Sequence, residues 1–360
     1  MILAVKDLEI TDKNTWFLNL PGPTNTWPFL VTFLDGAINL QGFTIRISEE
    51  KPTTGYFEPF IVGTDAYFVW AAVLVTNTNT QPMPSSVDEV GFEGMVVNDS
   101  VGTPIAPRNV YVAYTVQPWL AGLPTGAYTI TSSDFVRTAV GAGFWDIGPS
   151  QLTIGGNAAK GNRFNNTGIG ITLADFDSSR IDVSFNRLAD TKGIGLFAAQ
   201  GFYVPQEKSS ALLIHDNALE ANSPAWIWNS GIQIWENFGG QNQAARWQPV
   251  QIFANAFEIS FAHGASFFDQ NAISLVNVSG AAVLGNRVSG TGENAIYVGG
   301  DSASNGNTLA GNMLEQFRPH AGKADILLDT TSEYCTVNGS GNNTVTDKGT
   351  GNIVNGPRKQ

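Results

Sequence analysis

A short phrase recurs along the C-terminal part of the chain, and its spacing constrains the fold more than any other feature. Each copy has a β-rich run, an Asn, an apolar residue, a few polar residues and then Gly-Ile-x-Ile/Leu or a close variant, as in FNRLADTKGIGLF. Successive copies are 24, 31, 38, 31 and 26 residues apart, with insertions at the same two places. A variable period in this range indicates a solenoid. The repeated Asn residues are Asn162, Asn186, Asn217, Asn255, Asn286 and Asn312.

One copy shows how a coil is built. In SRIDVSFN, Ile181 and Val183 alternate with polar residues, which is the period of a strand. Asn186 marks a tight turn, and two further short strands follow. Three short strands per coil describe an all-β parallel β-helix, in which the Asn side chains should form a buried hydrogen-bonded ladder. The residues expected to stack inward from the third strand are Ile171/Leu173, Ile194/Leu196, Ile232/Ile234, Ile273/Leu275, Ile296/Val298 and Ile326/Leu328.

Composition narrows the range of partners. Charged residues make up only 14% of the 360 residues, the chain has 39 Gly, and the net charge is −12. Such an acidic surface repels nucleic acid and anionic membrane, so we expect neither as a partner. The single Cys335 excludes an internal disulfide framework, and no apolar run is long enough to predict membrane insertion.

The chain divides into three regions that differ in how regular the repeats are. Residues 127–345 give the regular coils, and 346–360 give a tail. Residues 1–126 contain plausible strands split by Pro-rich connections such as NTQPMPSSVDE. We interpret them as the first, loop-elaborated coils of the same solenoid, with a small separate β subdomain as the alternative.

Residues 127–345 carry an N-x-F…G-I-x-L repeat. In this they resemble the right-handed parallel β-helix proteins of the pectate-lyase-like superfamily. The resemblance implies a right-handed coil and leaves the function open, because this superfamily hosts lyases, hydrolases, epimerases, tailspikes and non-catalytic proteins. The catalytic motifs of polygalacturonases, pectate lyases and alginate lyases are not matched. The EKSS fragment that contains Lys208 is similar to a lysine motif of alginate lyases, but the Arg-His-Gly element that accompanies that motif is absent.

The long insertions predict a groove. They fall before the Gly-Ile-x-Leu strand, at 221–230, 260–271 and 316–323, and after it, at 198–210 and 236–248. Loops on both sides of one sheet would enclose a groove. Its aromatic faces beside polar groups suit sugar rings, which offer apolar C–H faces and hydroxyl edges. Packing of the loops onto the sheet is the alternative role for the aromatic residues. The predicted substrate-binding residues are Tyr203, Trp226, Trp228, Gln233, Trp235, Arg246, Trp247, His263 and Asp269.

Carboxylates at the ends of the third strands supply candidate chemistry. Aligning the copies on Leu173, Leu196 and Ile234 places Asp146, Asp175 and Glu236 in one column, with Ala198 between the last two. Glycoside cleavage needs a carboxylate pair roughly 5–10 Å apart. We assign Glu236 as the acid, Asp175 as its partner and Asp146 as the residue that tunes the pair. The alternatives are turn capping and a calcium site at Asp146, Asp175 and Asp177, and no other cofactor is expected.

The sequence thus predicts a carbohydrate-active protein that binds a polysaccharide or oligosaccharide and cleaves it by acid/base chemistry. The first alternative is a non-catalytic surface or tailspike-like β-helix that binds a glycan or another partner. The second is a polysaccharide lyase or epimerase that uses Lys208 or Arg246 with calcium. The start MILAVKDLEI is not typical of a signal peptide. We therefore expect a mature or trimmed form of an extracellular or periplasmic protein.

Overall fold

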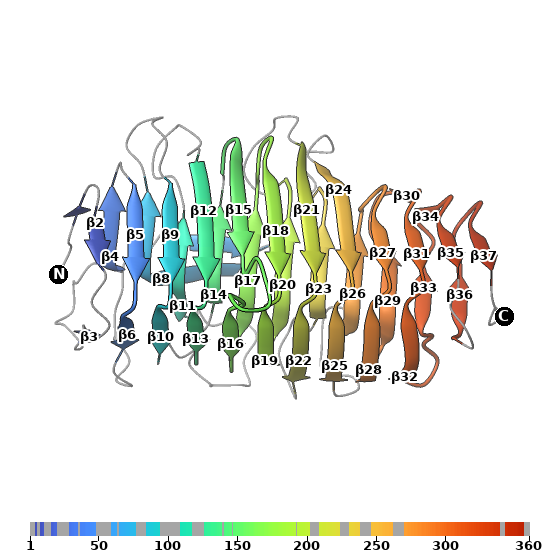
Figure 1. The fold of residues 1–360 in the computed structure, drawn as a ribbon. Helices are drawn as coiled ribbons and strands as arrows, with labels where there is room; N and C mark the ends of the chain where they lie inside the picture. Colours follow the sequence, from blue (N-terminus) through green and yellow to red (C-terminus); the bar gives the residue numbers. More distant parts are fainter. Residues whose placement is uncertain are drawn as a thin grey trace.

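Three parallel sheets enclose one core in this computed structural model (Figure 1). Every ladder is parallel except that between β7 and β8. The strands before residue 126 join the same three sheets as the later ones. The described residues are 4–5, 8–10, 16–19, 29–34, 37–47, 59–62, 65–76, 84–93, 109–116, 126–138, 140–145, 147–191, 193–201, 209–223, 230–237, 246–261, 270–338 and 343–355.

Sheet A contains the third strand of each repeat. In order along the sheet, its strands are β1 (Ala4–Val5), β4 (Phe29–Leu34), β8 (Asp65–Thr76), β11 (Asn109–Val116), β14 (Val140–Trp145), β17 (Ile169–Ala174), β20 (Ile194–Ala199), β23 (Ser230–Trp235), β26 (Asn271–Val276), β29 (Asn294–Gly299), β33 (Ile326–Leu328) and β36 (Val345–Asp347), with β7 (Pro59–Val62) beside β8.

Sheets B and C contain the strands before and after the Asn corner. Sheet B consists of β2 (Leu8–Ile10), β5 (Ile38–Gln41), β9 (Ser85–Asp88), β12 (Gly126–Thr131), β15 (Ser150–Ile154), β18 (Arg180–Ser184), β21 (Ser209–His215), β24 (Arg246–Phe253), β27 (Ala282–Leu284), β31 (Thr308–Ala310), β35 (Thr336–Asn338) and β37 (Ile353–Asn355). Sheet C consists of β3 (Trp16–Asn19), β6 (Thr44–Ile47), β10 (Gly91–Glu93), β13 (Asp134–Val136), β16 (Arg163–Asn165), β19 (Arg187–Thr191), β22 (Ala218–Ser223), β25 (Ala256–Phe261), β28 (Arg287–Gly292) and β32 (Met313–Pro319). A small fourth sheet pairs β30 (Ser304–Asn305) with β34 (Ser332–Glu333).

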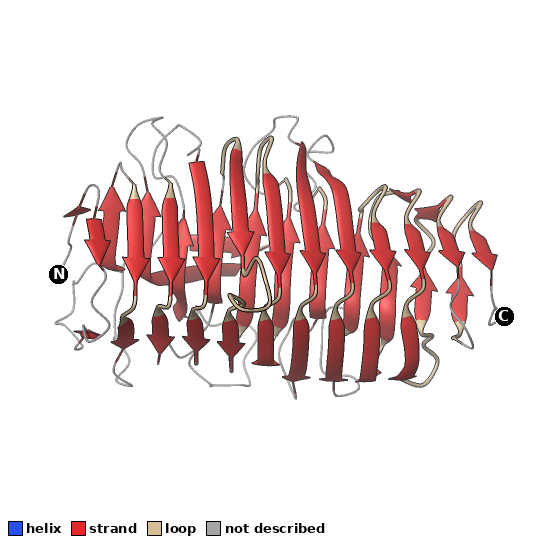
Figure 2. Ribbon diagram, viewed as in Figure 1, coloured by secondary structure: helices blue, strands red, loops and turns tan. Residues whose placement is uncertain are grey.

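These sheets form the right-handed parallel β-helix predicted from the repeats. The described residues contain only strands and connections (Figure 2). None of the elements in the described part of the chain is a helix long and apolar enough to cross a membrane.

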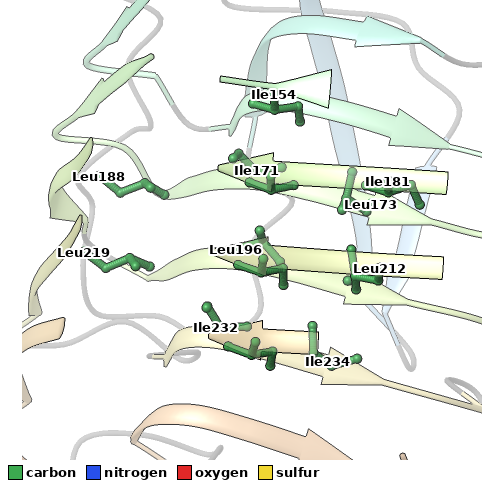
Figure 3. Close-up of a cluster of buried hydrophobic side chains, with 14 of the residues drawn as sticks. Ile154, Ile171, Leu173, Ile181, Leu188, Leu196, Leu212, Leu219, Ile232 and Ile234 are labelled. Carbon is green, nitrogen blue, oxygen red and sulfur yellow. The ribbon is translucent and has the colours of Figure 1, made fainter. Parts of the chain in front are cut away.

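Apolar side chains from all three sheets fill the interior. Figure 3 shows them stacked coil upon coil. On the sheet C side, the rings of Phe92, Phe135 and Phe164 stack with centroids 5.0 and 4.6 Å apart. The core is therefore a stack of like side chains, as the in-register repeats require. Its members around the middle coils include Ile154, Ile171, Leu173, Ile181, Leu188, Leu196, Leu212, Leu219, Ile232 and Ile234.

The predicted Asn ladder is confirmed. The six repeated Asn residues are all buried between sheets B and C. Each of the first five donates from Nδ2 to Oδ1 of the Asn in the next coil; the distance is 3.0 Å from Asn186 to Asn217 and 3.0 Å from Asn217 to Asn255. The same Nδ2 also donates to a carbonyl of the preceding coil, as Asn217 does to Val183 at 2.9 Å. The ladder thereby satisfies polar groups that the corner buries.

One predicted inward pair is wrong. The ladder pairs Ile171 with Leu196 and Leu196 with Ile232, so the inward pair of β20 is Leu196 and Ala198. Ile194 belongs instead to a second apolar cluster with Phe197 and Ala199. The segment KGIGLFAA has a Gly before both Ile194 and Leu196, and alternation alone cannot choose between them.

Close packing of a row of glycines determines which of the two residues points into the core. Gly141, Gly170, Gly195 and Gly231 form one row across sheet A, and a Cβ on Gly195 would lie 2.6 Å from the Gly231 carbonyl oxygen and 2.8 Å from a methyl of Leu219. We expect Gly195→Ala to lower the free energy of unfolding by about 1–3 kcal/mol through overpacking. Urea unfolding measures this directly. An unchanged midpoint would mean that Gly195 does not occupy the close-packed row.

Candidate functional site

The outer face of sheet A carries two of the predicted binding residues, Gln233 and Trp235. In each strand, alternate side chains point away from the core, and the ladder aligns them in two rows. The first row contains Thr172, Phe197, Gln233, Ser274 and Tyr297. The second row contains Trp145, Ala174, Ala199, Trp235 and Val276.

This outer face is covered. All residues of β14, β20, β26 and β29 are buried, although half of their side chains point away from the core. These strands therefore expose little surface, and a ligand could reach this face only through side chains that are partly exposed.

Trp235 is such a side chain. It is partly exposed at the end of β23, where it packs against the outer cluster of Ile194, Phe197 and Ala199. Trp145 lies in the same row three coils away, and two alanines separate the indoles. Sequence reasoning missed Trp145, because the row becomes visible only when the strand register is known.

Gln233 is the polar neighbour of Trp235 on this face. It points outward between Phe197 and Ser274 and is 7% exposed. Its amide makes no hydrogen bond with any residue that the structure describes. Buried polar groups normally have a partner, so this amide is available to the hydroxyl group of a ligand.

The carboxylates lie along the edge where sheet A strands end. Backbone N–H···O bonds run from Asp175 to Ala199, from Gln200 to Trp235 and from Glu236 to Val276, which places Asp175, Gln200 and Glu236 in one column. Two coil spacings, roughly 10 Å, therefore separate Asp175 from Glu236 at the backbone, as predicted. The residue between them is Gln200, and the expectation of Ala198 is wrong for the same register reason as above.

Asp175 caps a turn. Its side chain is 2% exposed, and Oδ1 accepts a 2.7 Å bond from the N–H of Gly201 in the next coil. Asn277, further along the same edge, accepts a 2.9 Å bond from the Ser302 N–H in the same way. The shared pattern indicates that side chains at this strand end accept hydrogen bonds from backbone N–H groups of the next coil. It matches the capping alternative.

Glu236 has no exposed surface. Its Oε1 accepts a 2.8 Å bond from the Trp247 N–H, and its Oε2 lies 3.5 Å from Nη1 of Arg246. Desolvation by burial raises the pKa of Glu236 from 4.5 to about 8, against the opposing effects of the Trp247 amide, Arg246 and the Ser279 amide. The carboxyl is thus mostly protonated at neutral pH and joins the two ends of the 236–247 segment.

Trp247 lies in the core, which corrects the prediction that it lines the groove. Arg246–Phe253 forms β24 of sheet B, and the Trp247 side chain packs inside the coil, with its ring centroid 5.9 Å from that of Phe176. The ring is fully buried and unavailable for stacking on a ligand. Arg246 is 38% exposed and faces Glu236.

The remaining predicted residues are Asp177 and seven that lie outside the described part of the chain. Of the proposed calcium ligands, Asp177 accepts a 3.0 Å bond from the Ser178 hydroxyl. Among the described residues, no three or more His, Cys, Asp or Glu side chains gather in a way that could hold a metal ion. The predicted site residues that lie outside the described part of the chain are Asp146, Tyr203, Lys208, Trp226, Trp228, His263 and Asp269.

A solved structure with a similar architecture supports the fold. The chain matches the Dettilon tailspike protein over 94% of its own length at 16% identity, with a TM-score of 0.52. The chain folds as a right-handed parallel β-helix. It spans 59% of the tailspike chain, less than two thirds of it.

Two enzymes also align over most of the chain. DFA-IIIase from Arthrobacter chlorophenolicus A6 matches 87% of this chain and 85% of its own at 12% identity, with a TM-score of 0.47. The periplasmic alginate epimerase AlgG matches 92% of this chain and 72% of its own at 14% identity, with a TM-score of 0.45. No protein-family model matches the sequence. No curated protein matches it either.

Proposed function

We propose that the protein binds a glycan on the outer side of sheet A. The observation that carries this proposal is the Gln233–Trp235 pair on β23, a half-buried indole beside a buried amide that has no hydrogen-bond partner among the described residues. An aromatic face beside an amide suits a sugar ring, which offers C–H faces and hydroxyl edges. The net charge of −12 disfavours polyanions, so the ligand is a neutral or weakly charged saccharide. The corresponding location is extracellular or periplasmic.

A glycan panel with one variant pair tests the proposal. We expect Trp235→Ala to weaken binding about tenfold or more, which corresponds to the loss of one stacking contact. Val276→Ala is the matched control, because Val276 follows Trp235 in the same row and also loses packing. Both variants should keep their melting temperatures within a few degrees. Equal binding by both variants and the wild type would overturn the proposal.

Glycoside cleavage is the second candidate, and the pKa of Glu236 supports it. A carboxyl group with a pKa of about 8 can donate a proton at neutral pH. Asp175 lies two coils away, roughly 10 Å at the backbone, and inverting enzymes separate their two carboxyl groups by roughly 6.5–9.5 Å. Because Glu236 has no exposed surface, a substrate can contact it only after a conformational change that exposes the carboxyl group. The lyase alternative has less support, because Arg246 already faces Glu236.

Turnover by Glu236→Gln separates cleavage from binding. If Glu236 is the acid, the variant should release reducing ends at least about a hundredfold more slowly than the wild type, with unchanged glycan affinity. An active wild type together with a fully active variant would remove Glu236 from the chemistry and leave binding untouched.

A further inference from the structure

The outer face of sheet C carries a hollow that the groove on sheet A does not include. Its volume is about 510 Å³, and it lies over β22, β25, β28 and β32, which run side by side in Figure 1. Four consecutive coils contribute to it. Its polar and floor residues are Glu220, Ala256, Glu258, Arg287, Ser289 and Gln316.

Two alanines create the hollow. The ladder aligns Arg187, Ala218, Ala256, Arg287 and Met313 in one outward row. Long side chains stand at both ends of the row, while Ala218 and Ala256 leave the strand backbone uncovered between them. The hollow therefore results from the small side chains at these two positions.

Polar side chains form one wall. Glu220, Glu258, Ser289 and Gln316 follow one another across the strands in register. Three of them make hydrogen bonds. Arg187 donates to Glu220 at 2.9 Å, Arg287 donates to Gln316 at 3.2 Å, and the Ser289 hydroxyl donates to the Phe257 carbonyl at 3.0 Å. Glu258 is exposed and makes no hydrogen bond or ion pair with any described residue.

The charges in and beside the hollow cancel. Arg187 and Arg287 balance Glu220 and Glu258, so the hollow favours neither an anion nor a cation. A neutral ligand with hydroxyl groups can donate to the Glu258 carboxylate and accept from the Arg287 guanidinium at the same time. The coil spacing of about 4.8 Å is close to the length of one sugar ring, so successive rings would meet successive coils.

We propose that this hollow is a second saccharide-binding site, which holds a neutral glycan segment against Ala218 and Ala256 with Glu258 and Arg287 as its polar contacts. The choice of ligand class rests on the proposed function, but the site does not, because it lies on a different sheet.

Alanine methyl groups report on both sites in one experiment. Ala218 and Ala256 form the floor of the hollow, whereas Ala174 and Ala199 lie in the outward row of sheet A. Protein with ¹³C-labelled alanine methyls is titrated with cellohexaose, mannohexaose and maltohexaose. We expect at least one of them to shift the Ala218 and Ala256 signals in a saturable way.

Two matched variant pairs test the contacts. Ala256→Gln fills the hollow, and Met313→Gln is its control, because Met313 lies in the same row outside the lining. Glu258→Gln removes the free acceptor, and Glu315→Gln is its control, because Glu315 is exposed on β32 outside the lining. We expect each first variant to weaken the Ala218 response at least about tenfold, as for loss of a charged hydrogen bond, and each control to keep it.

The outcomes separate the two proposals. Shifts confined to Ala174 and Ala199 would overturn the second site and keep the proposed function. Shifts confined to Ala218 and Ala256 would support the second site and count against binding at sheet A. No shift with any of the three sugars, or equal responses from Ala256→Gln and Met313→Gln, would overturn the second site.

Discussion

Replacing Asn217 by leucine is expected to lower the free energy of unfolding by about 3–6 kcal/mol. The Asn217 Oδ1 accepts from both the backbone N–H and Nδ2 of Asn186, and its own Nδ2 donates to the Val183 carbonyl. Leucine removes the partners of the Asn186 N–H and the Val183 carbonyl, and it leaves the Asn186 Nδ2 with only its bond to the Ile154 carbonyl. Each unsatisfied group costs about 1–3 kcal/mol. Urea unfolding monitored by far-UV circular dichroism measures the difference.

The matched control is Asn222→Leu. Asn222 lies in the same coil as Asn217 but is exposed on β22, so its replacement should change the midpoint little. Equal effects of the two substitutions would mean that the ladder contributes no more than surface asparagines do.

The second large effect is a dependence of stability on pH that Glu236→Gln should remove. Between pH 4.5 and about 8 the folded protein holds a proton on Glu236 that the unfolded chain releases. The free energy of unfolding therefore falls as pH rises through this window, by up to about 1.4 kcal/mol per pH unit from this group. Glutamine is a neutral isostere that can still accept from the Trp247 N–H.

We expect Glu236→Gln and the wild type to be about equally stable at pH 4.5, and the variant to be more stable at pH 8.5. The measurement is the difference between their unfolding free energies across this range, because other groups contribute equally to both proteins. Arg246→Leu should extend the window upward, since Arg246 opposes the rise in the pKa of Glu236. Parallel pH profiles for wild type and Glu236→Gln would show that Glu236 is ionised in the folded protein.

The sequence predicts the coil well because its periodic residues interact with their own copies. An Asn in one coil meets the Asn of the next, so the spacing of Asn186, Asn217 and Asn255 is enough to predict the ladder. The register of sheet A is less certain from sequence, since Gly193 and Gly195 both precede an apolar residue. Only the approach of Gly195 to the Gly231 carbonyl decides which one occupies the row.

The candidate site could be predicted only in part. Strand order places Asp175 and Glu236 on one edge, but burial decides what they can do, and burial depends on how insertions pack. Trp247 follows a long insertion and still belongs to a strand whose side chain turns inward. To predict the hollow on sheet C from the sequence, one would have to know the strand register from residue 218 to 316, including a shift between Arg287 and Ser289.

The most direct test of the central claim is a crystal structure of the protein soaked with an oligosaccharide that it binds. Glycan binding on sheet A predicts density for a sugar ring against the Trp235 indole, with a hydroxyl group within hydrogen-bond distance of the Gln233 amide. Sugar density elsewhere on the molecule, with Trp235 and Gln233 free of ligand at saturating oligosaccharide, would contradict it.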